Sequence, residues 1–320
     1  MYEANRFGAS PVFKTYAHGK LLLTGEYVIL DGALGLAIPV RFGQSLTASV
    51  PETPPQSLPL LYWYSLDEQG LPWFSAIFST DTFDVVHAPD AAVAVRLQKI
   101  FSACRHQNEQ FLRFPFSIQV VTQNDFPRSW GLGTSSTLIA ALARWANADA
   151  WQVLAATLGG SGYDLACAYA EGPLLYQLRA GAPLVQTVAF APPFSENLWC
   201  VYLGNKQDSR AGIAHYRQRT ASDQALLTAV SRLSEAVTTC TDLASFQDYL
   251  LEHERLIGDA LGLMPVQQRM FSDYPGAVKS LGAWGGDFVL AAGTLSAEET
   301  RRYFSSKGFT VIFPYTSMAL

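Results

Sequence analysis

Charged residues are scarce in this sequence. They make up 15% of its 320 residues, whereas hydrophobic residues make up 49%; a typical soluble chain has about 25% charged residues. A chain of this length and composition can bury a substantial core, which argues against disorder and favours a compact enzyme. The net charge of −5 gives no general attraction to nucleic acids or anionic membranes. We therefore expect a small-molecule substrate, neither of those partners, and a monomer or homodimer.

Cysteine and histidine are also few, and their spacing excludes common metal and redox motifs. The sequence has no C-x-x-C pair, and its five histidines are scattered without metal-ligand spacing. The four cysteines, which we expect to be reduced and mostly buried, are Cys104, Cys167, Cys200 and Cys240. No signal-peptide core, membrane-spanning run or internal repeat is visible. These absences favour a cytoplasmic protein.

The most informative stretch is FPRSWGLGTSSTLI, residues 126–139, which lies between a strand-like run and a helical pattern. Gly131 and Gly133 allow a tight turn and close approach to a ligand. The hydroxyl residues after them suit the first turn of a helix, where free N–H groups and the helix dipole favour an anion such as phosphate. The alternative is an ordinary glycine loop with a Ser/Thr cap. The third glycine of the dinucleotide fingerprint and the lysine of the Walker loop are both absent.

Hydrophobic periodicity along the chain predicts an α+β fold, because strands and helices come in blocks without steady alternation. The expected helices are 90–107, 134–148, a short helix through Leu158, 209–219, 223–237, 245–261 and 296–306. The expected strands are 12–17, 20–24, 34–40, 45–50, 59–64, 73–79, 116–122, 173–178, 183–190, 198–204 and 310–315, the early ones forming an antiparallel sheet. The first two are separated by a break at His18-Gly19, and residues 280–293 are expected as a loop. A domain boundary is placed near residue 190, giving domains 1–190 and 191–320.

Three further stretches have the composition of a functional site. Lys20 lies inside an apolar strand, where an unpaired lysine is rarely buried, although it could reach water at a strand edge. Asp164 follows Ser-Gly-Tyr at a helix start, where it could simply be an N-cap. The glycine-dense segment 282–287 is expected as a loop before a strand and could be a tight turn or bulge.

Taken in order, these stretches resemble the motifs of the GHMP kinase superfamily, which includes galactokinase, homoserine kinase, mevalonate kinase and phosphomevalonate kinase. KTYAHGKLLLTGEYVILDG is similar to the first motif, PRSWGLGTSST to the phosphate-binding second motif, and SLGAWGGDFVLA to the glycine-rich third motif. GEY, SGYD and GGD look most like phosphomevalonate kinase. SGYDLA also resembles a bacterial branch with a GYDIA signature.

The resemblance implies a two-domain α+β kinase fold that binds ATP, Mg²⁺ and an acceptor between its domains. Asp164 matches the catalytic aspartate, Lys20 the lysine that pairs with it, and Ser135 the hydroxyl that meets Mg²⁺. The implied nucleotide-binding residues are Gly131, Leu132, Gly133, Thr134, Ser135 and Ser136. The implied substrate-binding residues are Glu26, Lys206, Ser209, Arg210, Gly285, Gly286 and Asp287. The basic group at 206–210 would suit an anionic acceptor, although it could also be a solvated helix start.

Two departures from the family leave other functions open. Mevalonate kinases have a Mg²⁺-binding Glu about eleven residues before the catalytic aspartate, but here no acid lies between Asp149 and Asp164. Trp130 stands where the family has a small residue, and could cover the nucleotide base or form a wall. The resemblance thus predicts a mevalonate or phosphomevalonate kinase, with a diphosphomevalonate decarboxylase or a non-catalytic relative as alternatives.

Overall fold

The protein is described here by a computed structural model that covers residues 11–51, 58–205, 209–219, 223–282, 284 and 287–320. The chain forms two compact units, each made of several segments. The first unit comprises Met1–Gly19, Phe42–Arg128 and Gly133–Tyr169, and the second comprises Lys20–Arg41, Ser129–Leu132 and Ala170–Leu320. We expected one domain boundary near residue 190, whereas segments of the two units alternate along the chain.

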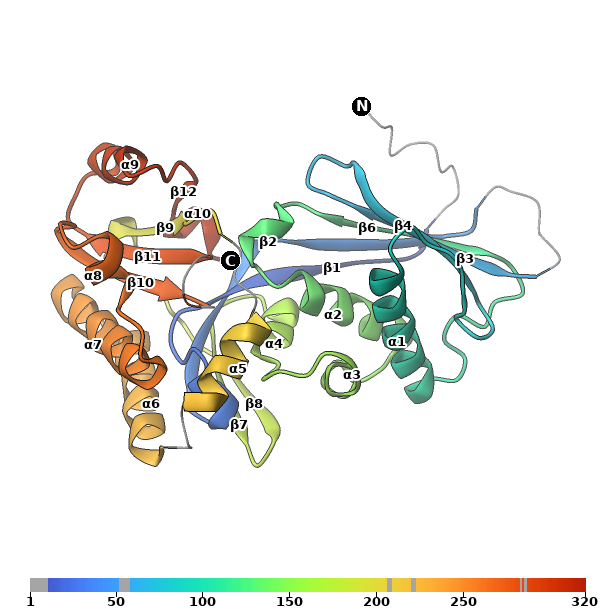
Figure 1. Cartoon of the computed structure of the whole chain (residues 1–320), viewed down its shortest axis with the longest axis horizontal. Coiled ribbons are helices and arrows are strands. Elements are labelled where there is room, and N and C mark those ends of the chain that lie inside the picture. Colours follow the sequence, from blue (N-terminus) through green and yellow to red (C-terminus); the bar gives the residue numbers. More distant parts are fainter. Residues whose placement is uncertain (1–10, 52–57, 206–208, 220–222, 283, 285–286) are drawn as a thin grey trace. The chain divides into compact units, whose positions relative to one another are not determined.

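The first unit contains a sheet with the strand order β5-β4-β3-β6-β2. These strands are β2 (Gly35–Ser49), β3 (Leu60–Leu66), β4 (Pro72–Ser79), β5 (Val85–His87) and β6 (Ile118–Asn124). Figure 1 labels β2, β3, β4 and β6. The neighbours pair antiparallel, as expected, except that β3 and β6 are parallel. The strand β1 (Pro11–Leu22) also pairs with β2 and continues through His18-Gly19, so the predicted break there is wrong.

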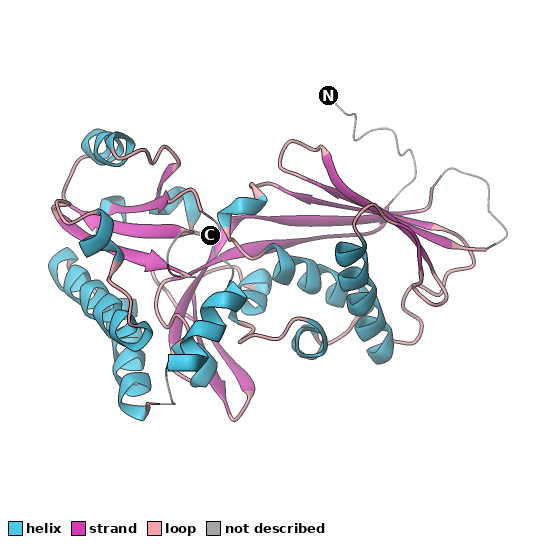
Figure 2. Ribbon diagram, in the orientation of Figure 1, coloured by secondary structure: helices cyan, strands magenta, loops and turns pink. Residues whose placement is uncertain are grey.

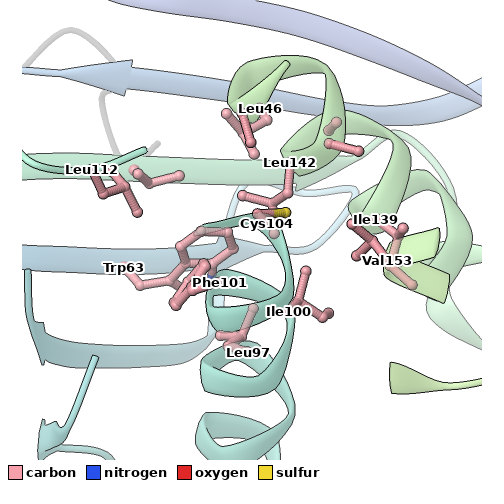
Figure 3. Packing of buried hydrophobic residues seen from close by; sticks show 14 of the residues in the cluster. Leu46, Trp63, Leu97, Ile100, Phe101, Cys104, Leu112, Ile139, Leu142 and Val153 are labelled. Carbon is pink, nitrogen blue, oxygen red and sulfur yellow. The ribbon is translucent and has the colours of Figure 1, made fainter. Parts of the chain in front are cut away.

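Helices of the first unit cover one face of this sheet. They are α1 (Ala91–Gln107), α2 (Thr134–Ala146), α3 (Ala150–Thr157) and α4 (Tyr163–Tyr169). The first three lie close to predicted helices, and α4 lies where a helix start was expected at Asp164. Asp90 and Asp149 cap α1 and α3 by accepting from first-turn N–H groups. Figure 3 shows the core beneath them, where Trp63 of β3 packs against Phe101 of α1 with ring centroids 5.4 Å apart. This packing fixes the helices whose N-termini form the candidate site.

The second unit contains a four-stranded sheet with the order β10-β11-β9-β12, visible as magenta arrows in Figure 2. The strands are β9 (Leu198–Tyr202), β10 (Gly276–Leu281), β11 (Phe288–Gly293) and β12 (Ile312–Pro314). The predicted loop at 280–293 is therefore wrong over its second half, because FVLAAG is a fully buried inner strand. The first half of β2 also pairs with β7 (Leu174–Arg179), which pairs with β8 (Ala182–Thr187).

The helices of the second unit include the four predicted from periodicity. These are α5 (Ser209–Arg219), α6 (Gln224–Thr239), α7 (Leu243–Leu261) and α9 (Ala297–Ser306). The short α8 (Val266–Met270) and α10 (Tyr315–Met318), and the 3₁₀ turns η1 (Val28–Asp31), η2 (Arg128–Trp130) and η3 (Ser195–Asn197), were not predicted. Within the described ranges, no helix has both the length and the apolar character needed to cross a membrane.

Candidate functional site

The glycine-rich turn has the backbone geometry of an anion-binding helix start. Gly131 and Gly133 have φ values of +69° and +95°, which favour glycine. α2 begins at Thr134 directly after Gly133, and no side chain caps it. The N–H groups of Ser136 and Thr137 both donate to the carbonyl of Gly133 at 3.0 Å. The first-turn N–H groups before them face no acceptor in the described part of the chain and are suited to an anionic ligand.

Gly131 is also required by close packing within the second unit. A Cβ atom at this position would lie 2.5 Å from the carboxylate of Asp287. Lys20 reaches the same residue, because its Nζ donates to the carbonyl of Gly131 at 3.0 Å. Lys20 and Asp287 are only 8% and 5% exposed. Residues from the first and third motifs therefore meet at the first glycine of the second motif.

The expected pairing of Lys20 with Asp164 stays a prediction. The ammonium of Lys20 donates a hydrogen bond to the Gly131 carbonyl and the side chain is buried. Lys20 is therefore not the solvated strand-edge lysine considered as the alternative. A Cβ atom at Gly282 would lie 3.7 Å from Nζ of Lys20 and 3.9 Å from Oδ2 of Asp287. Gly282 thus lies beside two buried charged side chains.

Trp130 packs against aromatic side chains of the second unit. Its ring centroid lies 5.9 Å from that of Phe288 and 5.3 Å from that of Phe313. The hydroxyl of Tyr202 donates to the carbonyl of Ser129 at 2.8 Å. These contacts hold the start of the glycine-rich turn against β9, β11 and β12. They favour the interpretation that Trp130 forms a wall over the interpretation that it covers the nucleotide base.

Asp164 lies in the first turn of α4 and is not its N-cap. The helix begins at Tyr163, and the side chain of Asp164 accepts its recorded hydrogen bond from Oγ of Ser136, with an Oγ–Oδ2 distance of 2.7 Å. Ser136 is 5% exposed, whereas Ser135 one residue earlier is exposed. The capping alternative therefore fails, and two residues of the predicted site come together in the first unit.

A magnesium site is less well defined than the anion site. Ser135 presents its side chain at the exposed start of α2, as a hydroxyl ligand would require. Across the described ranges, however, no group of three or more His, Cys, Asp or Glu side chains is placed to hold a metal ion. Binding of Mg²⁺ through Ser135 and nucleotide oxygens stays a prediction.

Glu26 lies in a buried ionic network of the second unit. It is 1% exposed, and its Oε1 accepts a hydrogen bond from the ammonium of Lys279, itself fully buried on β10. The N–H of Gly25 donates to Nε2 of His253 at 2.8 Å, so this nitrogen has no proton to donate to Oε2 of Glu26, 3.4 Å away. In the described residues, Oε2 of Glu26 and Nδ1 of His253 have no hydrogen-bond partner.

Burial determines the protonation of this network. Desolvation raises the pKa of Glu26 to about 7, although the charge of Lys279 opposes the shift. Desolvation also lowers the pKa of His253 well below its ordinary value, and Lys279 adds to that effect. Glu254, which accepts hydrogen bonds from Ser280, has its pKa raised by burial as well. Sequence reasoning missed this network; the signal was Lys279 inside the apolar strand GAVKSL.

Tyr27, in the first motif, packs against α5. It has a φ of +65°, which is uncommon for a residue with a side chain, and it is 9% exposed. Its ring stacks on that of Tyr216 in α5 with centroids 5.9 Å apart. A Cβ atom at Gly212, also in α5, would lie 2.8 Å from the hydroxyl of Tyr27. The lack of a side chain at Gly212 therefore allows α5 to pack closely against Tyr27, which directly precedes η1.

The arginines of α5 have different surroundings. Arg217 forms an ion pair with Asp31, which also accepts a hydrogen bond from the hydroxyl of Tyr216. Arg219 lies against Gly262 at the end of α7. Arg210 is exposed near the start of the helix. Lys206, Gly285, Gly286 and the side chain of Ser209, which the resemblance placed at the substrate, lie outside what the structure describes.

Comparison with known proteins identifies the fold. No family model matches the sequence, and no curated protein sequence matches it. Solved structures do match over nearly the whole chain. The mevalonate kinase of Methanococcus jannaschii has a TM-score of 0.70 at 11% identity, covering 94% of this chain and 96% of that one. The Streptococcus pneumoniae phosphomevalonate kinase in complex with phosphomevalonate and AMPPNP has a TM-score of 0.68 at 16% identity, covering 94% and 99%.

A sugar kinase has the same fold. The Lactococcus lactis galactokinase complexed with galactose matches with a TM-score of 0.63 at 12% identity, covering 92% of this chain and 88% of that one. At such identities the similarity establishes the fold alone. The predicted α+β fold and the resemblance to the GHMP kinases are confirmed at that level.

Proposed function

From the fold of the GHMP kinases, we propose that this protein is an ATP-dependent kinase that phosphorylates a small anionic acceptor. The observation that carries the proposal is the uncapped N-terminus of α2, with the Asp164 carboxylate hydrogen-bonded to its first turn. Backbone N–H groups for a phosphate and a carboxylate for a hydroxyl proton are two groups that phosphoryl transfer requires.

The nucleotide would bind through the turn from Gly131 to Ser135. The free first-turn N–H groups would hold phosphate oxygens, and the helix dipole would favour their negative charge. Lys20, held on the Gly131 carbonyl, would add a positive charge at the same turn. When bound, Mg²⁺ would neutralise phosphate charge, and Ser135 is the residue proposed to contact it.

Asp164 would act on the acceptor. Its carboxylate would take the proton of the acceptor hydroxyl as that oxygen bonds to the γ-phosphorus. The bond between the γ-phosphorus and the bridging oxygen would break, and ADP would leave with that oxygen. Positioning of the hydroxyl supplies much of the rate in such a reaction, so the orientation of Asp164 matters as much as its charge.

The acceptor proposed is phosphomevalonate or mevalonate, the isoprenoid precursors suggested by the GEY, SGYD and GGD motifs. The exposed Arg210 supports an anionic acceptor, because guanidinium groups bind carboxylate or phosphate in a two-pronged contact. The free, mostly buried cysteines support action in the cytoplasm. A monomer or homodimer remains the expected assembly.

A coupled ADP-release assay with five compounds tests this proposal. Purified protein and Mg-ATP are incubated with mevalonate, phosphomevalonate, diphosphomevalonate, homoserine or galactose, and products are identified by mass spectrometry. We expect a phosphorylated product from phosphomevalonate or mevalonate. Release of CO₂ from diphosphomevalonate would indicate a decarboxylase instead. Binding of ATP without turnover of any compound would indicate a non-catalytic relative.

A further inference from the structure

Ser136 has no hydrogen-bond donor left for a nucleotide. Its backbone N–H donates to the carbonyl of Gly133 at 3.0 Å, and its hydroxyl donates to Oδ2 of Asp164 at 2.7 Å. A serine has only these two donors. The expectation that Ser136 binds ATP phosphate along with its neighbours therefore does not follow from this geometry, although Ser135 beside it stays exposed.

The contact joins two helix starts that are far apart in sequence. Ser136 lies in the first turn of α2 and Asp164 in the first turn of α4, and the two helices pack against each other (Figure 1). A helical serine commonly turns its hydroxyl back to a carbonyl of the preceding turn. Here the hydroxyl points instead to a carboxylate 28 residues further along the chain.

The hydrogen bond leaves one carboxylate oxygen available. Oδ2 of Asp164 is engaged by Ser136, while Oδ1 accepts no hydrogen bond from any residue the structure describes. Ser136 is 5% exposed, so water cannot easily replace its hydroxyl on Oδ2. Asp164 therefore has one oxygen held by Ser136 and one oxygen that receives no donor from the described residues.

We propose that Ser136 is a positioning residue for Asp164, holding Oδ2 so that Oδ1 takes the proton of the acceptor hydroxyl. This inference rests on the proposed kinase function and adds a residue to it. Ser136 acts through Asp164 and does not contact the reacting atoms. Its effect should therefore appear in kcat and not in the binding of ATP.

The variant Ser136→Ala tests this role, with Thr137→Val as its matched control. Thr137 also has a buried hydroxyl in α2, which donates to Oε1 of Gln44 and to the carbonyl of Thr134, both at 3.0 Å. Both variants remove one buried hydroxyl from the same helix. We expect Ser136→Ala to lower kcat by about tenfold to a hundredfold, the range for a hydrogen bond to a charged group. The KM for ATP should stay near the wild-type value in both variants, and Thr137→Val should keep a near-normal kcat.

Two further variants separate positioning from a general loss of structure. Ser136→Cys keeps a weak donor of similar shape and should recover part of the rate lost in Ser136→Ala. In an Asp164→Asn background, Ser136→Ala should cause no further loss of kcat, because the residue it positions is already disabled. Should Ser136→Ala fail to fold by circular dichroism, Ser136→Cys alone, compared with Thr137→Val, still reports the effect on kcat.

The outcomes distinguish this inference from the proposed function. Absence of turnover in the wild-type protein rejects the kinase function before any variant is made, and the inference with it. A working wild-type kinase whose Ser136→Ala variant has the same kcat as Thr137→Val rejects the inference alone. A raised KM for ATP with unchanged kcat would also overturn it, because Ser136 would then serve the nucleotide.

Discussion

The hydroxyl of Tyr27 accepts a hydrogen bond from the backbone N–H of Trp284 at 3.0 Å. This contact ties the first motif to the third within the second unit, across 257 positions of the sequence. Trp284 itself is only 8% exposed, so its N–H depends on Tyr27 for a partner. A buried N–H that loses its acceptor costs about 1–3 kcal/mol.

Tyr27→Phe should therefore lower the free energy of unfolding by about 1–3 kcal/mol. Because the resemblance places the third motif near the acceptor, the acceptor KM should rise by about tenfold, which is about 1.4 kcal/mol of binding. ATP affinity should not change. Tyr303→Phe is the control, since it removes a hydroxyl that donates to Asp273 at an exposed position. An unchanged acceptor KM in a destabilised Tyr27→Phe variant would show that Tyr27 is only structural.

Gly133→Val should abolish tight binding of Mg-ATP. Valine is strained at a φ of +95°, and its side chain would stand where phosphate must approach the α2 N-terminus. Calorimetry should show at least a tenfold weaker affinity. Gly70→Ala controls for the backbone strain, because Gly70 also has a positive φ, +76°, in the first unit. Wild-type affinity in a folded Gly133→Val protein would disprove nucleotide binding at this turn.

Asp164→Asn should fold normally and lose turnover. Asparagine can accept the same hydrogen bond from Ser136, but it cannot take the proton of an acceptor hydroxyl. We expect a rate loss of about two orders of magnitude or more, with a melting temperature close to that of the wild-type protein. Near-normal turnover of the true substrate by the folded variant would refute the catalytic role.

The stability of the protein should depend on pH through Glu26. Its pKa is raised from 4.5 to about 7 in the folded protein, so the folded state holds a proton that the unfolded chain releases earlier. The stability from this group is complete below pH 4.5 and is lost as the pH rises to about 7. The Glu26→Gln variant has no titrating group at this position and does not lose this stability as the pH rises. The unfolding free energy of the variant, relative to wild type, should thus rise over this range, by on the order of 3 kcal/mol.

Chemical denaturation of both proteins at several pH values measures this difference. His253 has the opposite effect, because its lowered pKa reduces stability as the pH falls below 6.5. Since His253 is present in both proteins, its contribution largely cancels in the difference between their unfolding free energies. A difference that does not vary with pH would mean that Lys279 keeps Glu26 ionised throughout.

Arg210→Ala should raise the KM for an anionic acceptor while ATP affinity stays the same. Arg210 is an exposed basic residue near the start of α5. Arg302→Ala is the control, because it removes an exposed positive charge from α9. If the two variants behave alike, or if the protein prefers an uncharged sugar, the anionic acceptor is wrong.

The sequence by itself determined the fold class and the Gly-rich turn. Periodicity located α1, α6 and α7 closely, because each of these helices buries an apolar stripe. The two glycines predicted a tight turn before α2, and both have the positive φ that glycine adopts at little cost. Local patterns of this kind are set by residues a few positions apart, and they are readable without the fold.

The tertiary structure alone decided which side chains share a hydrogen bond. The strand β10 was not predicted, because a buried strand lacks the alternation that marks an exposed one. The contacts of Lys20 with Gly131, Glu26 with Lys279, and Ser136 with Asp164 span 111, 253 and 28 positions. No periodicity records such pairs, because they arise only when packed strands and helices bring distant residues together. Burial then raises the pKa of Glu26, and Ser136 holds one oxygen of Asp164. Both are properties of the folded chain and not of the residues alone.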